Sequence, residues 1–227
     1  MTNMADGIIN INGDSVQTLE VIFLMTMLTL LPSIVVLTTS FTRYIISLSF
    51  LRTAMGTQQT PPNLVLVGIA LFLTLFTMGP VIQQINVEAY TPYVNEEIDQ
   101  EEFFARAQIP LKSFMLQNVE TSSLRLFCEM ADVDPPADLE DGINRLPLRV
   151  IVPAFAASEL QRAFEIGLFL YLPFLMVDII VSTTLMSMGM IMLPPSMIST
   201  PFKLLLFVTL NGWELLFSTL VRGYQFQ

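Results

Sequence analysis

Residues 166–195 read IGLFLYLPFLMVDIIVSTTLMSMGMIMLPP, and this stretch decides the fold class of the chain. Before the final Pro-Pro pair it holds one charged side chain, Asp178, and one proline, Pro173. A run of 18 or more apolar residues is long enough to cross a hydrocarbon core about 30 Å thick as a helix. The stretch therefore predicts a long membrane helix that is broken at its Pro-Pro end.

The rest of the chain repeats this pattern. Of its 227 residues 53% are hydrophobic and 13% are charged, whereas a soluble domain carries about 25% charged residues. Further apolar runs lie at residues 21–37, 64–82 and 201–221, and the first of them extends past Pro32 with helical periodicity. Proline cannot continue a helix without the loss of a backbone hydrogen bond, so each Pro-Pro pair is expected to form a hairpin turn. The expected turn residues are Pro61, Pro62, Pro194 and Pro195.

The charges gather in one part of the chain. Residues 82–142 contain thirteen acids and three bases, whereas the remaining residues contain seven of each. Such a segment is typical of a solvated surface. A capping-box pattern at residues 158–161 (Ser-Glu-Leu-Gln) then predicts the start of the next long helix.

Together these patterns predict an all-α membrane protein with two long, kinked helical hairpins, four hydrophobic segments and a small, soluble, acidic helical insert. The expected division is an N-terminal tail at 1–20, a first hydrophobic hairpin at 21–82, the acidic insert at 83–157, and a second hydrophobic hairpin with a methionine-rich loop at 158–227.

The composition argues against several classes of function. The chain has no histidine and one cysteine, Cys128, so it lacks the usual general base and the commonest metal ligand. It contains no phosphate-binding or dinucleotide-binding motif and no cluster of basic residues of the kind that binds nucleic acid. We therefore expect no enzyme activity, no catalytic, cofactor-binding or metal-binding residues, and no nucleic-acid partner.

Two arginines suggest how the chain is oriented. Arg43 and Arg52 lie near the end of the first apolar run, and basic residues at the ends of membrane segments favour the cytoplasmic side. We interpret both as topology anchors. This orientation places the acidic insert outside the cytoplasm.

Ionisable residues inside the apolar runs require partners, because a charge in a membrane helix costs at least about 3 kcal/mol. The candidates are Asp178, Lys203, Glu214 and Glu159. For a helical hairpin that turns at Pro194, Asp178 lies about 24 Å from the turn, Lys203 about 14 Å and Glu214 about 30 Å. Since no two of these are level, Asp178 is expected to contact another subunit. A packing hydrogen bond or a proton relay are the alternatives.

Several stretches resemble the FliP/SctR family of type III secretion export-gate subunits. They cover most of the chain outside the N-terminal tail and the acidic insert. The matching stretches are TSFTR (39–43), SFLR (49–52), GTQQTPPN (56–63), GIALFLT (68–74), PAF (153–155), SEL (158–160), LPFL (172–175) with Asp178, MGMIMLPP (188–195), PFKL (201–204) and GW (212–213). The Ser-Phe-Thr-Arg start and the Gly-Trp end look flagellar, with an injectisome subunit as the alternative.

The resemblance implies a core subunit of the flagellar export gate in the bacterial inner membrane. It implies a homopentameric ring in the flagellar basal body, assembled with FliQ and FliR, working beside FlhA and FlhB, and passing unfolded flagellar substrates through its centre without a cofactor. Its hydrophobic surfaces are expected to face lipid or other subunits. A secondary transporter that uses Asp178 as a coupling carboxylate is the main rival, because broken helices and intramembrane acids also mark carriers.

Methionine recurs at every second position at the end of the long apolar run. An extended segment would place Met186, Met188, Met190 and Met192 on one side, and flexible thioethers adapt to different surfaces. The resemblance implies that Met190, Ile191 and Met192, with Met188 beside them, form a gasket around the pore. Methionines that act only as hydrophobic filler are the simpler alternative.

Overall fold

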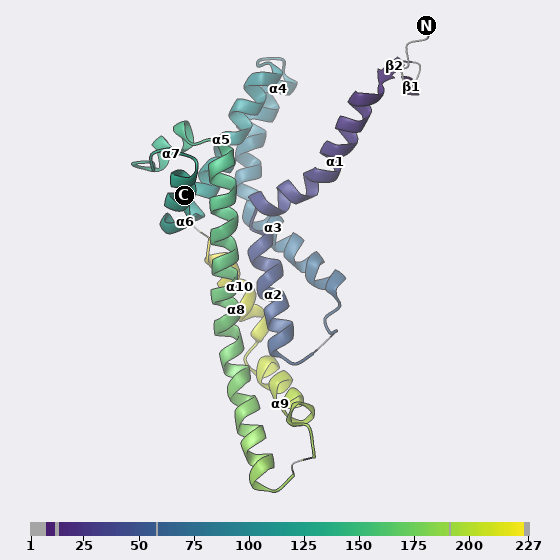
Figure 1. Ribbon diagram of the computed structural model, residues 1–227, viewed down its shortest axis with the longest axis vertical. Coiled ribbons are helices and arrows are strands. Elements are labelled where there is room, and N and C mark those ends of the chain that lie inside the picture. The colour runs from purple at the N-terminus through teal and green to yellow at the C-terminus, as the bar shows by residue number, and fades with distance from the viewer. Residues whose placement is uncertain (1–7, 12–13, 58, 191, 225–227) are drawn as a thin grey trace.

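The computed structural model describes residues 8–11, 14–57, 59–190 and 192–224, and it confirms an all-α membrane protein with one short N-terminal β-hairpin. The hairpin pairs β1 (Ile8–Ile11) with β2 (Asp14–Gln17) in antiparallel register. The helices, in chain order, are α1 (Thr18–Thr38), α2 (Phe41–Ala54), α3 (Asn63–Ile85), the π-helical η1 (Asn86–Tyr90), α4 (Thr91–Val94), α5 (Gln100–Asn118), α6 (Thr121–Met130), α7 (Leu139–Arg145), α8 (Leu148–Ser187), α9 (Pro195–Thr209) and α10 (Gly212–Arg222). Figure 1 shows α8 along the length of the molecule, α9 folding back at its lower end, and α1 extending away from the body.

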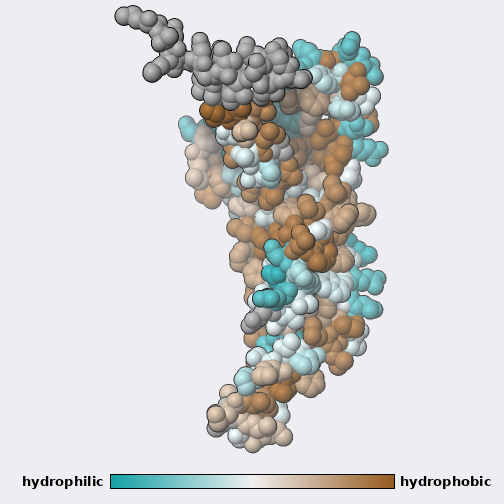
Figure 2. Space-filling view, turned by 90° about the vertical axis from the view of Figure 1, so that its right-hand side faces the viewer, coloured by the Kyte–Doolittle hydropathy of each residue, from teal (hydrophilic) through white to brown (hydrophobic). Residues whose placement is uncertain are grey.

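The described helices include the predicted four hydrophobic segments. Three helical stretches, residues 21–38, 63–94 and 148–187, are long and apolar enough to cross a membrane. Helices α9 and α10 form a fourth segment that bends by 65° between them. The bend falls at Asn211, which has a left-handed φ of 50° that asparagine tolerates better than most residues. Figure 2 shows hydrophobic residues over much of the visible face.

The first hydrophobic run continues past Pro32 as a helix, as expected, and it is divided further along the chain. Pro32 lies inside α1, and the break falls at residues 39–40. There the hydroxyl groups of Thr38 and Thr39 donate hydrogen bonds to the carbonyl oxygens of Ile34 and Val35, at 2.9 and 2.8 Å. Threonine hydroxyls that bond the preceding turn bend helices, and here they accompany the end of α1.

The boundaries of the acidic insert also differ from those predicted. Helix α3 runs to residue 85 and continues through η1 and α4 to Val94, so the first hairpin extends past residue 82. Helix α8 begins at Leu148, so the capping pattern at residues 158–161 does not start it. Ser158 instead lies inside α8, where its buried hydroxyl accepts a 2.9 Å hydrogen bond from the backbone N–H of Glu120.

The insert and the hairpins share one core. Helices α5 and α7 begin at aspartate caps, where Asp99 accepts a bond from the Glu102 N–H and Asp138 accepts one from the Asp141 N–H. From α5, Phe114 stacks on Tyr224 near the C-terminal end, with ring centroids 5.8 Å apart. The insert is therefore packed onto the membrane helices.

Helices α2 and α8 make the most extensive contact in the molecule. At their closest approach Gly167 of α8 faces the ring of Phe50, and a Cβ atom at position 167 would lie 2.5 Å from ring carbons. A real Cβ atom is essentially never that close to another heavy atom, so this crossing requires glycine. The contact fixes α8 against α2 above the point where α9 folds back (Figure 1).

Candidate functional site

The methionine loop, residues 188–190 and 192–194, joins α8 to α9 at the far tip of the hairpin. Helix α8 ends when Gly189 adopts a left-handed φ of 76°. The Gly189 N–H then donates to the Met186 carbonyl and the Met190 N–H donates to the Leu185 carbonyl, both at 3.0 Å. This pair of bonds is the Schellman motif, a helix ending that favours glycine because it has no Cβ atom. Pro194 and Pro195 then cap and open α9.

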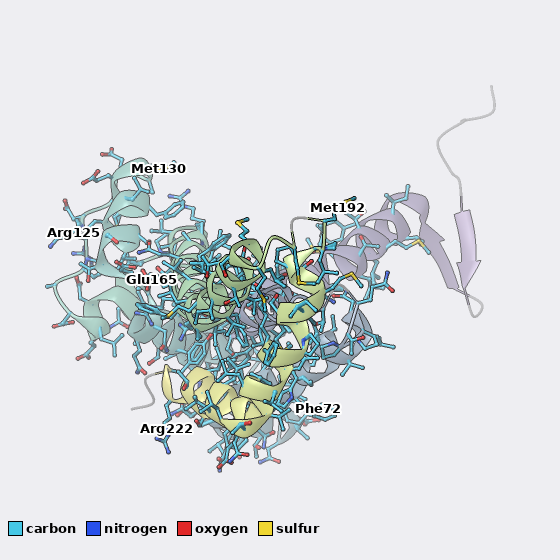
Figure 3. The ribbon with its side chains drawn as sticks, turned by 90° about the horizontal axis from the view of Figure 1, so that it is seen from below. Phe72, Arg125, Met130, Glu165, Met192 and Arg222 are labelled. Carbon is cyan, nitrogen blue, oxygen red and sulfur yellow. The ribbon has the colours of Figure 1, made fainter. Side chains whose placement is uncertain are left out.

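The methionine side chains in this loop face outward. Met188 is 70% exposed, Met190 48% and Met192 97%. Figure 3, a view from below, shows Met192 at the tip of the α8–α9 connection. The remaining predicted gasket residue, Ile191, lies outside the described residues. A loop that presents exposed, flexible thioethers can pack against other apolar groups of variable shape.

An ion pair joins the two helices behind the methionine loop. Lys203 Nζ of α9 lies 2.6 Å from Asp178 Oδ2 of α8, and the hydroxyl of Ser199 donates a 2.6 Å bond to Asp178 Oδ1. Lys203 also donates a 3.2 Å bond to the carbonyl oxygen of Ala54, the last residue of α2. Lys203 and Ser199 are buried, whereas about a third of the Asp178 side chain is exposed.

The premise that no two of the ionisable residues in the apolar runs are level is therefore wrong, and Asp178 has partners, Lys203 and Ser199, within its own chain. The predicted depths treated the chain as helical up to Pro194, but α8 ends at Ser187 and α9 begins at residue 195. Counted from these ends at 1.5 Å per residue, Asp178 and Lys203 lie about 13.5 and 12 Å from the loop. The two side chains are therefore level. Residues 188–194 do not continue either helix, so they should not be counted in the helical distance from the turn.

A second buried cluster lies higher on α8. Arg43 of α2 binds both carboxylate oxygens of Glu159 and donates a 3.0 Å bond to the carbonyl oxygen of Gly223. The Tyr224 hydroxyl donates to Glu159, and the Arg43 guanidinium carbon lies 3.7 Å from the centroid of the Tyr224 ring. All of these side chains are buried.

This cluster corrects the interpretation of Arg43 as a topology anchor. An anchor of that kind holds its charge in water or among lipid headgroups. Only 1% of Arg43 is exposed, and its charge is neutralised inside the protein by Glu159. Arg43 is therefore a core residue that connects α2, α8 and the C-terminal end of α10.

The other predicted residues occupy the surface or the turns. Arg52, partly buried in the last turn of α2, lies 3.5 Å from the carbonyl oxygen of Pro61. Pro61 lies in the connection before α3, and Pro62 caps that helix. Glu214 lies exposed in the first turn of α10, away from the Asp178 pair.

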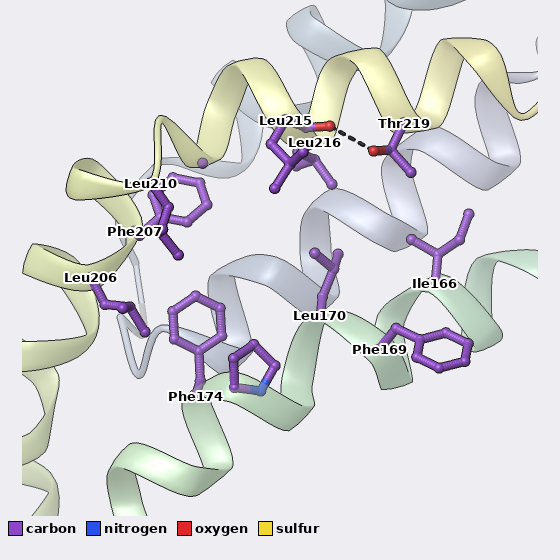
Figure 4. A pocket seen from close by; sticks show the side chains of 12 residues that line it. Ile166, Phe169, Leu170, Phe174, Leu206, Phe207, Leu210, Leu215, Leu216 and Thr219 are labelled. Atoms are coloured by element: carbon purple, nitrogen blue, oxygen red, sulfur yellow. Dashed lines mark hydrogen bonds between the residues drawn. The ribbon is translucent and has the colours of Figure 1, made fainter.

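An apolar groove runs along α8, α9 and α10, and Figure 4 shows the first of its two cavities. It consists of a cavity of about 470 Å³ between the three helices and an adjoining one of about 670 Å³ between α8 and α9, with Leu206 lining both. The first cavity is lined by Ile166, Phe169, Leu170, Pro173, Phe174, Leu206, Phe207, Leu210, Gly212, Leu215, Leu216 and Thr219. The second is lined by Val177, Ile180, Val181, Thr184, Leu185, Ile198, Phe202, Leu205, Leu206 and Thr209. We call the two together the hairpin groove.

The described residues contain no group of three or more Asp, Glu or Cys side chains placed to hold a metal ion. Four buried or partly buried ionisable groups in the membrane helices, Arg43, Glu159, Asp178 and Lys203, are joined in two ion pairs. Paired ionisable groups and exposed methionine side chains suit helix packing and flexible apolar contact.

Sequence reasoning missed three residues that complete these clusters. Ser199 lies one helical turn before Lys203, so its position on the same face was a usable signal. Tyr44 and Tyr224 are different, since their partners Thr77 and Glu159 lie far away in the sequence. No local pattern identifies contacts of that kind.

The chain is similar to known flagellar proteins over nearly its whole length. The profile of the FliP family matches residues 24–220. The "Flagellar biosynthetic protein FliP" of Aquifex aeolicus is 49% identical over 213 residues, which cover 94% of this chain and 88% of the relative. The proteins of the same name from Bacillus subtilis and Caulobacter vibrioides are 46% and 44% identical, over 92% and 98% of this chain and 92% and 84% of their own lengths. The matched region contains the methionine loop and both ion pairs.

Proposed function

The chain belongs to the FliP family, and we propose from this premise that it is a core subunit of the flagellar type III protein export gate. It is a membrane-embedded component of flagellar biosynthesis and export. The relatives bear flagellar names, which favours the flagellar apparatus over an injectisome. It acts without covalent chemistry of its own.

The finer proposal is a ring-shaped channel of five copies. In this assembly FliQ and FliR are the neighbouring subunits, FlhA and FlhB belong to the same export apparatus, and unfolded flagellar proteins pass through the centre. We place the assembly in the bacterial inner membrane at the flagellar basal body, with the acidic insert outside the cytoplasm. Large exposed apolar side chains along α1 and α8 support completion of the chain by lipid or by other subunits.

The observation that carries the proposal is the methionine loop. Its thioethers project from a non-helical tip, and the Asp178–Lys203 pair holds the two helices behind it at a fixed spacing. Several such tips around a shared axis would close a passage with flexible apolar groups and yield to different polypeptides. Polypeptides would then be selected by the width of the opening between the methionine side chains.

Ion conductance of the assembled complex tests the gate. Replacing Met190 and Met192 with alanine shortens the exposed side chains, so the assembled variant is expected to leak small ions. Met176→Ala is the matched control, because Met176 is a methionine of α8 outside the loop whose exposure, 63%, lies between those of Met190 and Met192. Unchanged conductance of a fully assembled Met190→Ala, Met192→Ala complex would refute the gasket.

The carrier alternative finds less support in the site. A coupling carboxylate must exchange its ligand or proton during transport. Both oxygens of Asp178 already have partners in the same chain, Lys203 and Ser199, which supports a structural role. Uptake of a small solute by this chain alone in vesicles is the result that would favour a carrier.

A further inference from the structure

The hairpin groove consists of two adjoining apolar cavities on the surface of α8, α9 and α10. Its α8 lining runs from Ile166 to Leu185, a rise of about 28 Å, which is close to the thickness of a hydrocarbon core. Each of its two cavities falls within the range of about 300–1,000 Å³ that is usual for small-molecule sites. A long, flexible, apolar ligand matches this shape.

Two arginines lie beyond one end of the hairpin groove. Arg162 precedes the lining residue Ile166 by one turn of α8, and Arg222 follows the lining residue Thr219 by one turn of α10. Each arginine therefore lies on about the same face of its helix as the residues that line the hairpin groove. The two helices run in opposite directions, since Tyr224 after α10 bonds Glu159 near the start of α8. Both arginines therefore lie at the same end of the hairpin groove.

This end carries an excess of positive charge. Glu159 is neutralised by Arg43 in the core. Glu165 is the remaining acid nearby on α8, and it accepts a 3.2 Å bond from Gln161. Glu214 lies in the first turn of α10, at the helix end opposite Arg222. Of the charged groups named at this end, three are arginines, Arg43, Arg162 and Arg222, and two are carboxylates, Glu159 and Glu165, which leaves one positive charge in excess; Arg162 also attracts the charge of Glu159.

We propose that the hairpin groove binds an anionic phospholipid. An acyl chain lies along the apolar lining, and the headgroup phosphate is held by Arg162 and Arg222. Arginine binds phosphate through paired N–H donors, and basic pockets between membrane helices bind anionic headgroups. The site does not depend on the export role, so the two proposals can fail separately.

Lipid retention by the full chain tests the site. The protein, purified in a nonionic detergent, is mixed with phosphatidylglycerol or with phosphatidylcholine of the same acyl chains and measured by native mass spectrometry. Phosphatidylglycerol is expected to be retained preferentially. Arg162→Gln and Arg222→Gln should each weaken its retention about fivefold, and the double variant roughly thirtyfold. Arg106→Gln, in an exposed pair of the acidic insert, is the control that should retain the lipid normally.

Further variants separate the lipid site from a folding defect. Arg162→Lys with Arg222→Lys keeps both charges and should restore most of the retention. Thr219→Phe places a ring at the mouth of the hairpin groove and should lower retention with both arginines present. Equal retention of the two lipids, or wild-type retention by the double Gln variant, overturns the proposal. A crosslinking experiment gives a further outcome that would overturn the proposal. If a Cys128→Ala, Leu215→Cys chain crosslinks to a second copy of itself whichever lipid is supplied, the hairpin groove is occupied by protein and not by lipid.

Discussion

Lys203 Nζ lies 2.6 Å from Asp178 Oδ2 and 3.2 Å from the carbonyl oxygen of Ala54, so one ammonium group joins α9 to both α8 and α2. The link lies behind the methionine loop, between the two helices that the loop joins, and it is formed within a single chain. It gives the hairpin a defined spacing within the isolated chain. Loss of the pair should therefore be visible in the isolated protein.

Asp178→Asn is expected to lower the free energy of unfolding of the isolated chain. The variant leaves the buried Lys203 ammonium without a carboxylate. Breaking a buried pair costs about 3–5 kcal/mol, but Asp178 is partly exposed and screened, so we expect about 1–3 kcal/mol. Thermal unfolding in detergent measures the change.

Two comparisons make this test specific. Glu214→Gln removes an exposed acid of α10 and should leave the unfolding temperature nearly unchanged. Adding Lys203→Met to Asp178→Asn removes the uncompensated charge and should recover part of the stability. Equal unfolding temperatures for Asp178→Asn and Glu214→Gln would show that the pair contributes nothing.

The Asp178 pair also shows how far the sequence alone could lead. Hydropathy and proline position are local properties, so they predicted the fold class, the hydrophobic segments and both turns. The need of Asp178 for a partner followed from the energetics of burial. The identity of the partner depended on where α8 stops, and the helix end at Gly189 shifts the register by several residues.

Arg43 and the start of α8 illustrate what a local pattern cannot contain. Arg43 and Glu159 are separated by 116 residues, and no spacing rule connects them. The first ten residues of α8 follow a strongly acidic segment and were assigned to the soluble insert. Their apolar face, with Val150, Ile151 and Phe155, is buried in the core that the insert shares with the hairpins.

Arg43→Lys should destabilise the protein strongly. Lysine cannot bind both oxygens of Glu159 while also reaching the Gly223 carbonyl, and it loses the planar contact with Tyr224. We expect a loss of about 2–4 kcal/mol in the free energy of unfolding. Chemical denaturation in a mild detergent provides the measurement.

The chain supplies a matched control for that substitution. Arg106 pairs with Glu102 on the exposed face of α5, where both side chains are more than 40% exposed. Arg106→Lys should change the stability by less than about 0.5 kcal/mol. If both lysine variants behave alike, burial of the Arg43 pair has no energetic consequence.

Gly167→Ala is expected to disturb the contact between α2 and α8. The added methyl group would lie 2.5 Å from ring carbons of Phe50 and 3.1 Å from its Cβ, so the ring cannot simply rotate away. Overpacking of this kind costs about 1–3 kcal/mol.

Gly68→Ala is the control within α3, because nothing lies within 4 Å of its Cβ position, and it should be neutral or stabilising. Adding Phe50→Leu to Gly167→Ala should restore part of the lost unfolding temperature, and failure to do so would place the strain elsewhere.

Cys128 offers a probe of the acidic insert, since it is buried in α6 and is the single cysteine of the chain. Burial raises the pKa of its thiol, so a smaller fraction is thiolate at neutral pH than for an exposed cysteine. We expect maleimide to label native Cys128 at least about tenfold more slowly than a cysteine at position 130 in a Cys128→Ala, Met130→Cys chain, because Met130 is 73% exposed on the same helix. Because its folded pKa is raised, the labelling rate of Cys128 should begin to climb at a higher pH than that of the exposed cysteine.

Unfolding the protein should abolish the difference in labelling rate between the two cysteines. Equal rates in the native state would mean that α6 opens readily, and the shared core of insert and hairpins would then be too loose to position α8.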